Sequence, residues 1–364
     1  MTQPTMLGYI HDQPRALLEC FLNRKEFVDP MVHIFKENDI RKVYLLGSGT
    51  SYHASLAIKN YLETYLQVEA EVCIPTMFTH YVKVNNNKIY NNRQILVIGI
   101  SQSGTSYSTV NAMEKAKDMG YLTVALTENL NSMICDEVEV VDHLLCGKEL
   151  IPIETRGYTV TVLTGYLWAV EVSKALDLLD EQRYKEILLK TEQMLKNYHS
   201  YLEEVEEWYQ LNQSELLSLK HGHITAYGNN YCTALEGVLK LYETFRMPLS
   251  AYELEELIHG PQMAFEDSTY IFIVASDEVE LKRVPLFVQW FKENEVTEHV
   301  FVFSNKMEKT SNKDLKFKTE IFEDLSPLVY TLPFQIMAAR NSLAVGYDTS
   351  KRRSKRQAFA HKYE

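Results

Sequence analysis

Short apolar runs that end in polar turns, each followed by an amphipathic stretch of helical length, constrain the fold of this chain more than any other sequence feature. The clearest run is QILVIGI at 94–100, which leads into the polar segment SQSGTS and then into a helical pattern at 107–119. Another run, at 41–46, precedes the helical stretch 52–66. Strands that alternate with helices at this spacing indicate a parallel sheet with helices on both faces.

The strand-and-helix pattern occurs twice, which predicts two domains of the same kind. In each half a strand runs into glycine and then into a helix, although the two halves share little residue identity. Between them, residues 157–217 contain no proline and carry apolar residues at three-to-four spacing, as packed connecting helices do. The further strands that we predict are 71–74, 121–126 and 138–145 in the first half and 223–227, 270–275, 298–303 and 317–322 in the second.

Length and charge narrow the possible functions. A chain of 364 residues is too long for one ordinary core and suggests two α/β domains of roughly 150–200 residues each. The net charge of −12 argues against general nucleic-acid binding. Because the overall field repels anions, any phosphate group must be bound by local hydrogen-bond donors.

Cysteine usage and the absence of apolar segments predict a cytoplasmic protein. The five cysteines are widely spaced and form no CxxC, which fits reduced thiols better than disulfides or a zinc site. The N-terminus lacks the basic and apolar segments of a signal peptide, and no run of about 18 apolar residues is available to span a membrane. We expect neither a metal nor an organic cofactor.

Two Ser/Thr-rich turns are candidates for binding a phosphate group. SQSGTS at 101–106 follows a buried strand and opens a helix, so hydroxyls, an amide and backbone N–H groups gather at the positive end of a helix dipole. GSGTS at 47–51 is a turn of the same type after the first strand, and the two would lie side by side if their strands are neighbours. The alternative is that both turns only cap their helices.

One helix of the second half places three charged side chains on one face. Glu236, Lys240 and Glu243 are spaced i, i+4 and i+7, within reach of one another. Periodicity alone favours a surface ladder of ion pairs, and a functional cluster is the alternative. The apolar side of the helix would consist of Leu235, Val238, Leu239 and Tyr242.

A histidine turn follows this helix. His259 is held between a glutamate-rich segment and Gly260-Pro261. A histidine fixed in such a turn suits proton transfer near neutral pH. A lone histidine is more often structural, however. The turn therefore supports a catalytic role only together with the charged helix.

Taken together, these motifs resemble the sugar isomerase (SIS) domain family. The resemblance lies in GSGTSY at 47–52, ISQSGTS at 100–106, ALEGVLKLYE at 234–243 and HGP at 259–261, in the same order and spacing. It covers nearly the whole chain from about Gly47 onward, and the motifs are specific in combination. The best matches within the family are the isomerase half of glucosamine-6-phosphate synthase and the fructosamine-6-phosphate deglycases.

The resemblance implies a fold, an assembly and residue roles. It implies two domains with flavodoxin-like parallel sheets and a homodimer whose active sites are shared, with the HGP histidine supplied by the partner subunit. It makes Glu243 the general base between C1 and C2 of the sugar and His259 the group that opens the sugar ring. Glu236 and Lys240 then support the open-chain substrate. The residues implied in binding the substrate phosphate are Ser51, Ser101, Gln102, Ser103 and Ser106, with Thr50 as a further substrate-binding residue.

Several departures from the family narrow the activity. Thr105-Ser106 replaces the usual Glu-Thr, so a hydroxyl is kept while a carboxylate is lost. Too few residues precede the sugar domains for a glutaminase domain, so we expect no release of ammonia from glutamine. Glu154 stands where the synthase has Ser, and a carboxylate there suits the amine of a substrate. The basic tail has no lysine that aligns without a gap with the synthase lysine that engages the sugar carbonyl; the nearest counterparts are His361 and Lys362.

The sequence therefore predicts a deglycase that cleaves a ketosamine 6-phosphate, such as a fructose-amino-acid phosphate, into glucose 6-phosphate and a free amine. An aldose–ketose isomerase or an amino-sugar 6-phosphate isomerase or deaminase would use the same Glu243 and His259. A non-catalytic sugar-phosphate sensor is the remaining alternative, but no basic DNA-recognition helix precedes the first strand. We expect no nucleic-acid or membrane partner.

These expectations define five segments of the chain. The basic tail would be either a solvated segment or a lid over the site. The segments are an N-terminal helical segment at 1–40, a phosphate-binding SIS domain at 41–178, connecting helices at 179–218, a SIS domain with the catalytic helix at 219–347, and the tail at 348–364.

Overall fold

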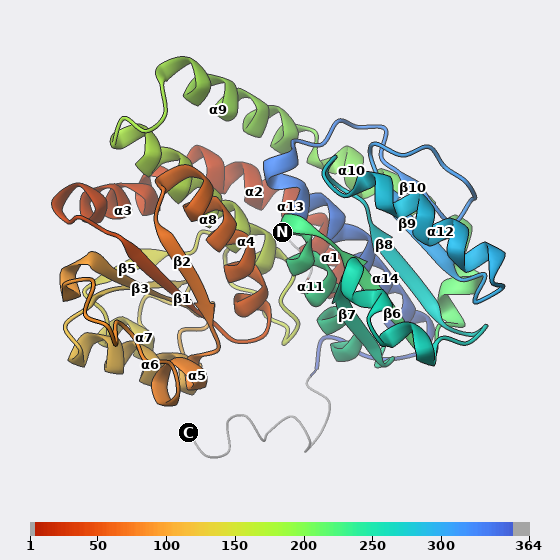
Figure 1. Cartoon of the computed structure of the whole chain (residues 1–364), viewed down its shortest axis with the longest axis horizontal. Coiled ribbons are helices and arrows are strands. Elements are labelled where there is room, and N and C mark those ends of the chain that lie inside the picture. The colour runs from red at the N-terminus through yellow and green to blue at the C-terminus, as the bar shows by residue number, and fades with distance from the viewer. Residues whose placement is uncertain (1–3, 352–364) are drawn as a thin grey trace. The chain divides into compact units, whose positions relative to one another are not determined.

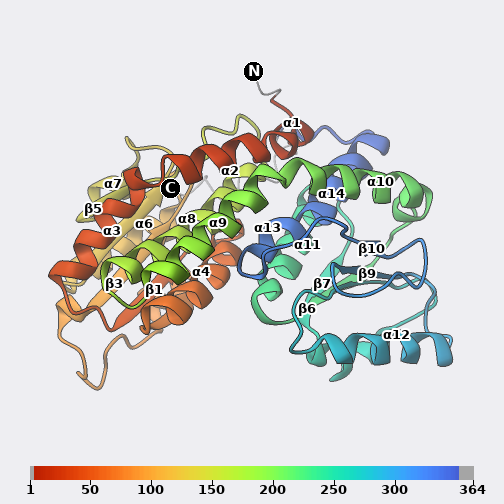
Figure 2. The same ribbon diagram turned by 90° about the horizontal axis from the view of Figure 1, so that it is seen from above.

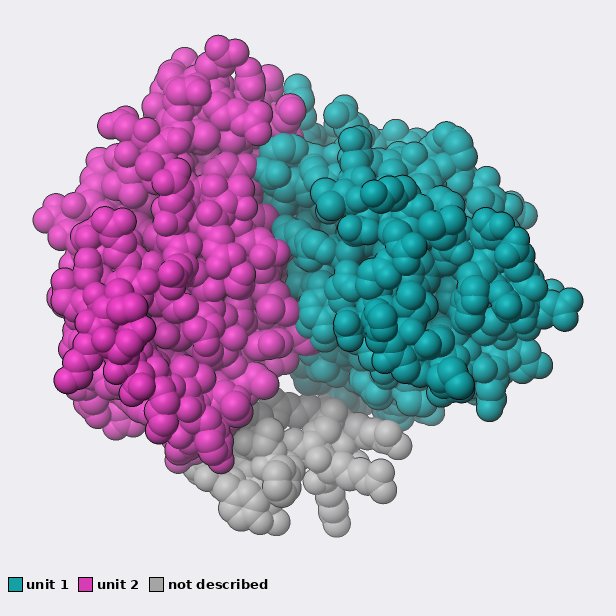
Figure 3. All heavy atoms as spheres, in the orientation of Figure 1, with its two compact units in different colours: residues 1–14, 150–155, 193–351 teal, residues 15–149, 156–192, 352–364 magenta. Residues whose placement is uncertain are grey.

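Two five-stranded parallel sheets organise the chain, one in each half (Figure 1). The structure, a computed structural model, describes residues 4–351. It divides into two compact units, shown in different colours in Figure 3. Unit 2 contains the first sheet and comprises residues 15–149 and 156–192; unit 1 contains the second sheet and comprises residues 4–14, 150–155 and 193–351.

The sheet of unit 2 has the strand order β2-β1-β3-β4-β5, with every neighbouring pair parallel. The order reverses between β1 and β3, which is the place where open α/β sheets of flavodoxin type bind ligands. The strands are β1 (Lys42–Leu46), β2 (Glu69–Cys73), β3 (Ile95–Ile100), β4 (Leu122–Thr127) and β5 (Val140–His143).

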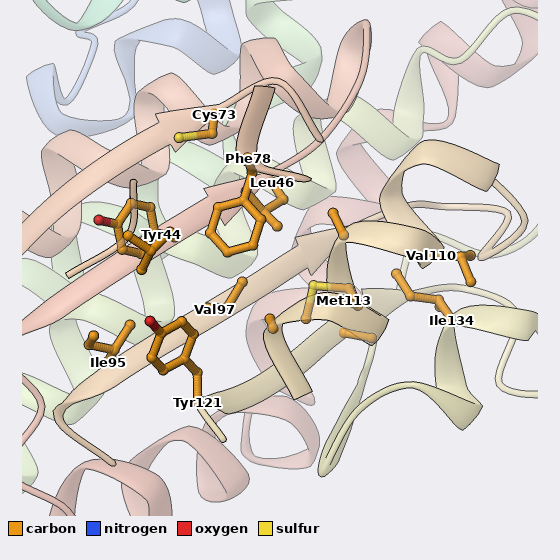
Figure 4. Packing of buried hydrophobic residues seen from close by; sticks show 14 residues of the cluster. Tyr44, Leu46, Cys73, Phe78, Ile95, Val97, Val110, Met113, Tyr121 and Ile134 are labelled. Carbon is orange, nitrogen blue, oxygen red and sulfur yellow. The ribbon is translucent and has the colours of Figure 1, made fainter. Parts of the chain in front are cut away.

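Helices cover both faces of this sheet. Figure 4 shows the apolar cluster on one face, where Phe78 of α5 and Met113 of α6 pack against Tyr44 and Val97 of the strands. On the other face α8 packs closely along α4, and a Cβ added at Gly165 would meet Ile58 Cγ1 at 2.2 Å. The helices before and within this half are α2 (Gln13–Leu22), α3 (Lys25–Glu37), α4 (Thr50–Leu66), α5 (Pro75–His80), α6 (Tyr107–Asp118), α7 (Met133–Asp136), α8 (Arg156–Ala175) and α9 (Glu181–Lys196).

The sheet of unit 1 repeats the topology of the first. Its order, β10-β9-β8-β6-β7, is the order of the first sheet when it is read from β7. The two α/β sheets confirm the predicted fold class, and the repeated order fits the duplication inferred from the sequence. The strands are β6 (Gly222–Ala226), β7 (Leu249–Glu253), β8 (Tyr270–Val274), β9 (Val300–Ser304) and β10 (Leu315–Lys316).

Aromatic side chains dominate the core of unit 1. Figure 2 shows α12 on one side of this sheet and α10 and α14 on the other. Phe287 and Phe291 of α12 belong to the cluster on the first side, whereas Trp208 of α10 and Phe334 of α14 contact Phe303 of β9 on the second. The helices of this unit are α1 (Met6–His11), α10 (Tyr198–Leu217), α11 (Tyr231–Glu243), α12 (Val284–Glu293), α13 (Ser326–Tyr330) and α14 (Leu332–Ala344), and its 3-10 turns are η2 (Gly228–Asn230), η3 (Glu255–Ile258), η4 (Pro261–Ala264), η5 (Leu281–Arg283) and η6 (Glu323–Leu325).

The predicted strand at 317–322 is wrong. Its apolar spacing is real, since Phe317 and Ile321 are buried, but the backbone between them bonds to side chains of α10. Glu204 accepts the N–H of Lys318 at 2.6 Å and the N–H of Thr319 at 3.1 Å. These bonds occupy groups that a strand would pair with its neighbour, so the strand ends at Lys316.

Strand β7 was not predicted from the sequence. β7 lies at the edge of its sheet, pairs with β6 alone, and is only partly buried along most of its length. Its sequence, LSAYE, therefore lacks the continuous apolar run that marks the inner strands.

No helix within residues 4–351 is both long and apolar enough to cross a membrane.

A buried carboxyl group in unit 2 is expected to make the stability of the protein depend on pH. Asp142 on β5 is 1% exposed, and within the described residues neither of its oxygens has a partner that meets the full geometry of a hydrogen bond. The indole of Trp168 donates to Phe27 O instead, at 3.1 Å. Burial raises the pKa of Asp142 to about 8, and Trp168 offsets only part of that rise.

We predict that Asp142→Asn removes a loss of stability between about pH 4 and pH 8. The unfolded carboxyl has a pKa of about 3.9, so in this window the folded state keeps a proton that the unfolded state releases, and stability falls as pH rises. The asparagine variant should unfold at higher urea concentration than the parent at pH 8 and show little gain at pH 4. Exposed Asp118→Asn is the control, and an equal pH slope in parent and Asp142→Asn would contradict the prediction.

Candidate functional site

The two Ser/Thr-rich turns lie at the carboxyl ends of neighbouring strands. β1 pairs with β3 along its whole length, with Leu46 opposite Gly99, so the turns after both strands leave the sheet at one edge. Helix α4 begins at Thr50 and α6 at Tyr107, directly after these turns. The expected juxtaposition of GSGTS and SQSGTS is therefore present, at the point where the strand order reverses.

Gly104 determines the shape of the turn after β3. Its φ is +67°, and a Cβ added there would meet Ser132 Oγ at 1.8 Å, so no other residue fits. Gly104 N donates to Ser101 O at 3.0 Å and lies 3.1 Å from Ser101 Oγ. The turn is also tied to β4 and α7, because Ser101 N bonds to Leu126 O and Ile134 N bonds to Gly104 O. The loop is thus held rigidly from several sides.

Polar groups of this turn remain available to a ligand. Ser103 is exposed and its hydroxyl shares a 3.0 Å hydrogen bond with Thr105. In the described part of the chain no hydrogen bond engages the backbone N–H of Ser103 or Ser106. Gln102 donates from its amide to the sulfur of Cys146 at 3.6 Å. Hydroxyls with unused N–H groups at a helix N-terminus form an anion-binding arrangement.

Simple helix capping does not account for the two turns. Ser106 is the N-cap residue of α6, yet its side chain makes no capping hydrogen bond. The N-cap of α4 is Gly49, which has no side chain and adopts a φ of +56°. Ser51, the second residue of α4, is 8% exposed. Neither N-cap residue therefore uses a side-chain hydroxyl to cap its helix, as the alternative interpretation requires.

The charged face of α11 is buried, contrary to the surface ladder that periodicity favoured. Glu236 and Lys240 are both 0% exposed, and the side chain of Glu243 is 32% exposed. Lys240 Nζ lies 3.2 Å from Glu236 Oε1 and 2.8 Å from Glu243 Oε2. The expected apolar side of the helix faces outward instead: three of its members are partly buried and one is exposed, namely Leu235, Val238, Leu239 and Tyr242.

Negative charge surrounds the buried lysine. Burial by itself would lower the pKa of Lys240, but the carboxylates of Glu236, Glu243 and Glu154 outweigh it and raise the pKa above its ordinary value. Lys240 is therefore cationic at neutral pH. Glu154 comes from residues 150–155, a short segment that leaves the chain of unit 2 and belongs to unit 1 with α11. The structure thus brings Glu154 into electrostatic contact with the charged helix.

A buried amide network fixes the segment that carries Glu154. The carbonyl of Thr155 accepts from Gln335 Nε2 at 3.4 Å, and Gln335 Oε1 accepts from Gln13 Nε2 at 2.6 Å. The hydroxyl of Tyr198 donates to Gln13 Oε1 at 3.1 Å. All three partner side chains are 0% exposed. This network is not predictable from the sequence, because glutamines in separate helices give no signal until the fold brings them together.

His259 lies on an exposed turn of unit 1. It follows the 3-10 turn η3, where its N–H bonds to Glu256 O at 3.2 Å, and its side chain is exposed. Within residues 4–351 no hydrogen bond joins His259 to Glu243. The positive charge that His259 can carry contributes, after the ion pair with Arg283, to a lowered pKa of Glu255.

The structure gathers the predicted site residues in two groups. Unit 2 holds the phosphate-turn residues together, and unit 1 holds Glu154, Glu236, Lys240 and Glu243 together with the His259 turn. His361 and Lys362 lie outside the described residues.

The family model described as SIS domain matches residues 38–167. This stretch of the chain is a SIS domain. The match covers β1 to β5 with both Ser/Thr turns and confirms the resemblance seen in the motifs. The second half repeats its topology.

Curated relatives extend the likeness over most of the chain. The glutamine–fructose-6-phosphate aminotransferase (isomerizing) of Neisseria meningitidis serogroup B is 28% identical over 359 residues, covering 95% of this chain and 56% of its own length. The protein of the same name from Caldanaerobacter subterraneus is 26% identical over 356 residues, covering 96% and 57%. The chain therefore spans a little over half the length of these relatives.

Solved structures share the fold of the whole chain. A protein from Clostridium difficile 630, described as a candidate phosphosugar isomerase, is 26% identical with a TM-score of 0.87, covering 99% of this chain and 98% of its own. The C-terminal domain of glucosamine-fructose-6-phosphate aminotransferase from Francisella tularensis has a TM-score of 0.84 at 21% identity, covering 95% and 98%, and shows the fold alone.

We predict that Lys240→Met destabilises the protein far more than Glu243→Gln. The methionine deprives buried Glu236 of its ammonium partner, which typically costs about 3–5 kcal/mol of unfolding free energy. Glu243 lies at the solvent-facing end of the cluster, so its neutralisation should cost about 1 kcal/mol or less. Urea unfolding measures both, with Lys185→Met on the exposed surface of α9 as the control. Equal losses in Lys240→Met and Lys185→Met would contradict the buried cluster.

Proposed function

We propose that this chain is a sugar-phosphate enzyme that cleaves a ketosamine 6-phosphate into glucose 6-phosphate and a free amine. The observation that carries this proposal is the charge of the cluster in unit 1. Three carboxylates, Glu154, Glu236 and Glu243, act on one ammonium, Lys240, which leaves a formal charge of −2. A negative surplus at partly buried groups favours a substrate with a protonated amine over a neutral ketose.

The proposed chemistry is a proton transfer between two adjacent carbons. Glu243 removes a proton from C1 of the open-chain substrate, and the C1–C2 enaminol forms. Protonation of C2 then gives an imine at C1, and water adds to the imine and releases the amine. Lys240, 2.8 Å from Glu243, fixes the carboxylate and stabilises its charge. A positioned acid or base of this kind typically contributes about 10²–10⁴ in rate.

The Ser/Thr turns supply the phosphate anchor in this proposal. Their hydroxyls and unused N–H groups suit a dianion, and the dipoles of α4 and α6 both begin there. The energy gained at the phosphate would contribute to substrate binding, and the turns would take no part in proton transfer.

His259 is proposed to open the sugar ring in the active site of a second subunit. Support comes from its exposure and from the absence of a hydrogen bond to Glu243 within the described residues. The homodimer with shared sites belongs to the same proposal. An aldose–ketose isomerase or an amino-sugar 6-phosphate deaminase would use the same base, and relatives by fold include structures of both kinds. The charge of the Glu154 cluster favours an amine-bearing substrate.

Purified protein incubated with fructose-amino-acid 6-phosphates should release glucose 6-phosphate and free amino acid. We predict that Glu243→Gln lowers kcat by at least about 10²-fold while the sugar phosphate still binds, because the amide keeps the shape but cannot accept the proton. Coupled detection of glucose 6-phosphate and binding calorimetry measure the two effects. Full activity of Glu243→Gln would exclude it as the base, and turnover of glucosamine 6-phosphate or a plain ketose phosphate alone would favour the alternative enzymes.

The double variant Ser101→Ala, Ser103→Ala should raise KM for the phosphorylated substrate by about 10-fold or more, because each lost hydrogen bond to a charged group is worth about 1.5–3 kcal/mol. Its kcat should change much less. Thr79→Ala, whose hydroxyl bonds to a backbone carbonyl of α5, is a matched hydroxyl-deletion control in the same unit. An unchanged KM would remove the phosphate role of the turn.

A further inference from the structure

We propose that Gln262 is a positioning residue that fixes the orientation of His259. The inference rests on the proposed function of His259 in ring opening and extends it to a residue outside the HGP motif. It follows from the hydrogen bonds of one side chain.

The amide of Gln262 bridges the two residues that flank His259. Its Oε1 accepts from Gly260 N at 2.7 Å, and its Nε2 donates to Ile258 O at 2.5 Å. No other side chain in the described part of the chain hydrogen-bonds the backbone of residues 258–260. A single amide therefore closes the turn on both sides of the histidine.

The backbone here has a shape that needs such support. Gly260 has a φ of +126°, a conformation that side-chain-bearing residues rarely adopt, and a Cβ added there would contact nothing within 4 Å. Packing against the core cluster holds Ile258 but not the residues after it, since His259 and Gly260 are exposed and Met263 is 85% exposed. Within residues 4–351, Gln262 is thus the one side chain that hydrogen-bonds this turn, beside the backbone bonds from His259 N to Glu256 O at 3.2 Å and from Met263 N to Gly260 O at 3.0 Å.

The chain just before the histidine is anchored independently. Leu257 is buried, and Glu253 accepts the N–H of Glu255 at 2.8 Å. Arg283 forms a bidentate ion pair with Glu255, with the Nη2–Oε2 distance at 2.9 Å. Loss of the Gln262 bridge should therefore loosen the His259 turn and leave η3 in place.

Position matters for a proton-transfer group. A displacement of about 1 Å of a group in the reactive arrangement can reduce the rate by about 10²-fold. If His259 transfers the proton that opens the sugar ring, a loosened turn slows ring opening. The later proton transfer between C1 and C2, which Glu243 performs, is then unaffected. This distinction makes the inference testable with two substrates.

The experiment compares Gln262→Leu with the parent on a ketosamine 6-phosphate that forms a ring and on its 5-deoxy analogue, which lacks the hydroxyl needed for ring closure. We expect kcat on the ring-forming substrate to fall by about 10–100-fold and kcat on the analogue to stay within about twofold. The control is Gln289→Leu on α12, a glutamine of unit 1 whose amide donates to Glu293 and not to the His259 turn. This variant should change kcat on neither substrate. Urea unfolding of Gln262→Leu confirms that the global fold is kept.

Equal kcat losses on both substrates, or no loss on either, would overturn the positioning role. His259→Ala separates this result from the proposed function. If His259→Ala loses activity selectively on the ring-forming substrate while Gln262→Leu does not, the inference about Gln262 fails alone. If His259→Ala keeps full activity on both substrates, the ring-opening role of His259 fails and the role of Gln262 fails with it.

Discussion

A lysine ammonium that is removed from water needs negative partners, and the arrangement of unit 1 around Lys240 meets that requirement. Glu236 pairs with it in the buried interior of the helix face, and Glu243 pairs with it at the solvent-facing end. The Glu154 segment, fixed by the amide network of Gln335, adds a third carboxylate. Because a buried charge is tolerated only with its partners in place, the position of this cluster depends on several elements at once.

The repeated sheet topology explains where the two kinds of site residue come from. In unit 2 the helix after the first strand, α4, begins with the Ser/Thr turn, and in unit 1 the corresponding helix, α11, carries the charged cluster. One copy of the fold thus presents hydrogen-bond donors at its strand ends, and the other presents carboxylates along the helix. In the proposed function, the same scaffold would supply the phosphate anchor in one unit and the groups for proton transfer in the other.

Much of the fold and of the candidate site is predictable from the sequence, for physical reasons. Inner parallel strands such as β3 are buried on both faces, so their apolar runs stand out, and the turns that follow them are found by position. Periodicity also shows that Glu236, Lys240 and Glu243 share a face of α11. It does not show which face is buried, and here the charged face is the inner one. Which face of α11 is buried depends on partners such as Glu154, which lies far away in the sequence.

Other features were beyond prediction because they depend on contacts between distant segments. The edge strand β7 is too exposed to show an apolar run, and the apolar pattern at 317–322 is real but its backbone bonds to Glu204. The role of Gln262 is local in sequence, yet it becomes visible only when the positive φ of Gly260 is known. Polar side chains that bond to backbone groups leave no periodic signal.

We propose that Glu243, in the cluster around Lys240, removes a proton from C1 of an amine-bearing sugar phosphate. The most direct test uses a ketosamine 6-phosphate with two deuterium atoms on C1 and follows the product by mass spectrometry and NMR. The account predicts glucose 6-phosphate with one deuterium at C1, the other having moved to C2 or to solvent. A product that keeps both deuterium atoms on C1, as direct displacement of the amine would give, contradicts the account.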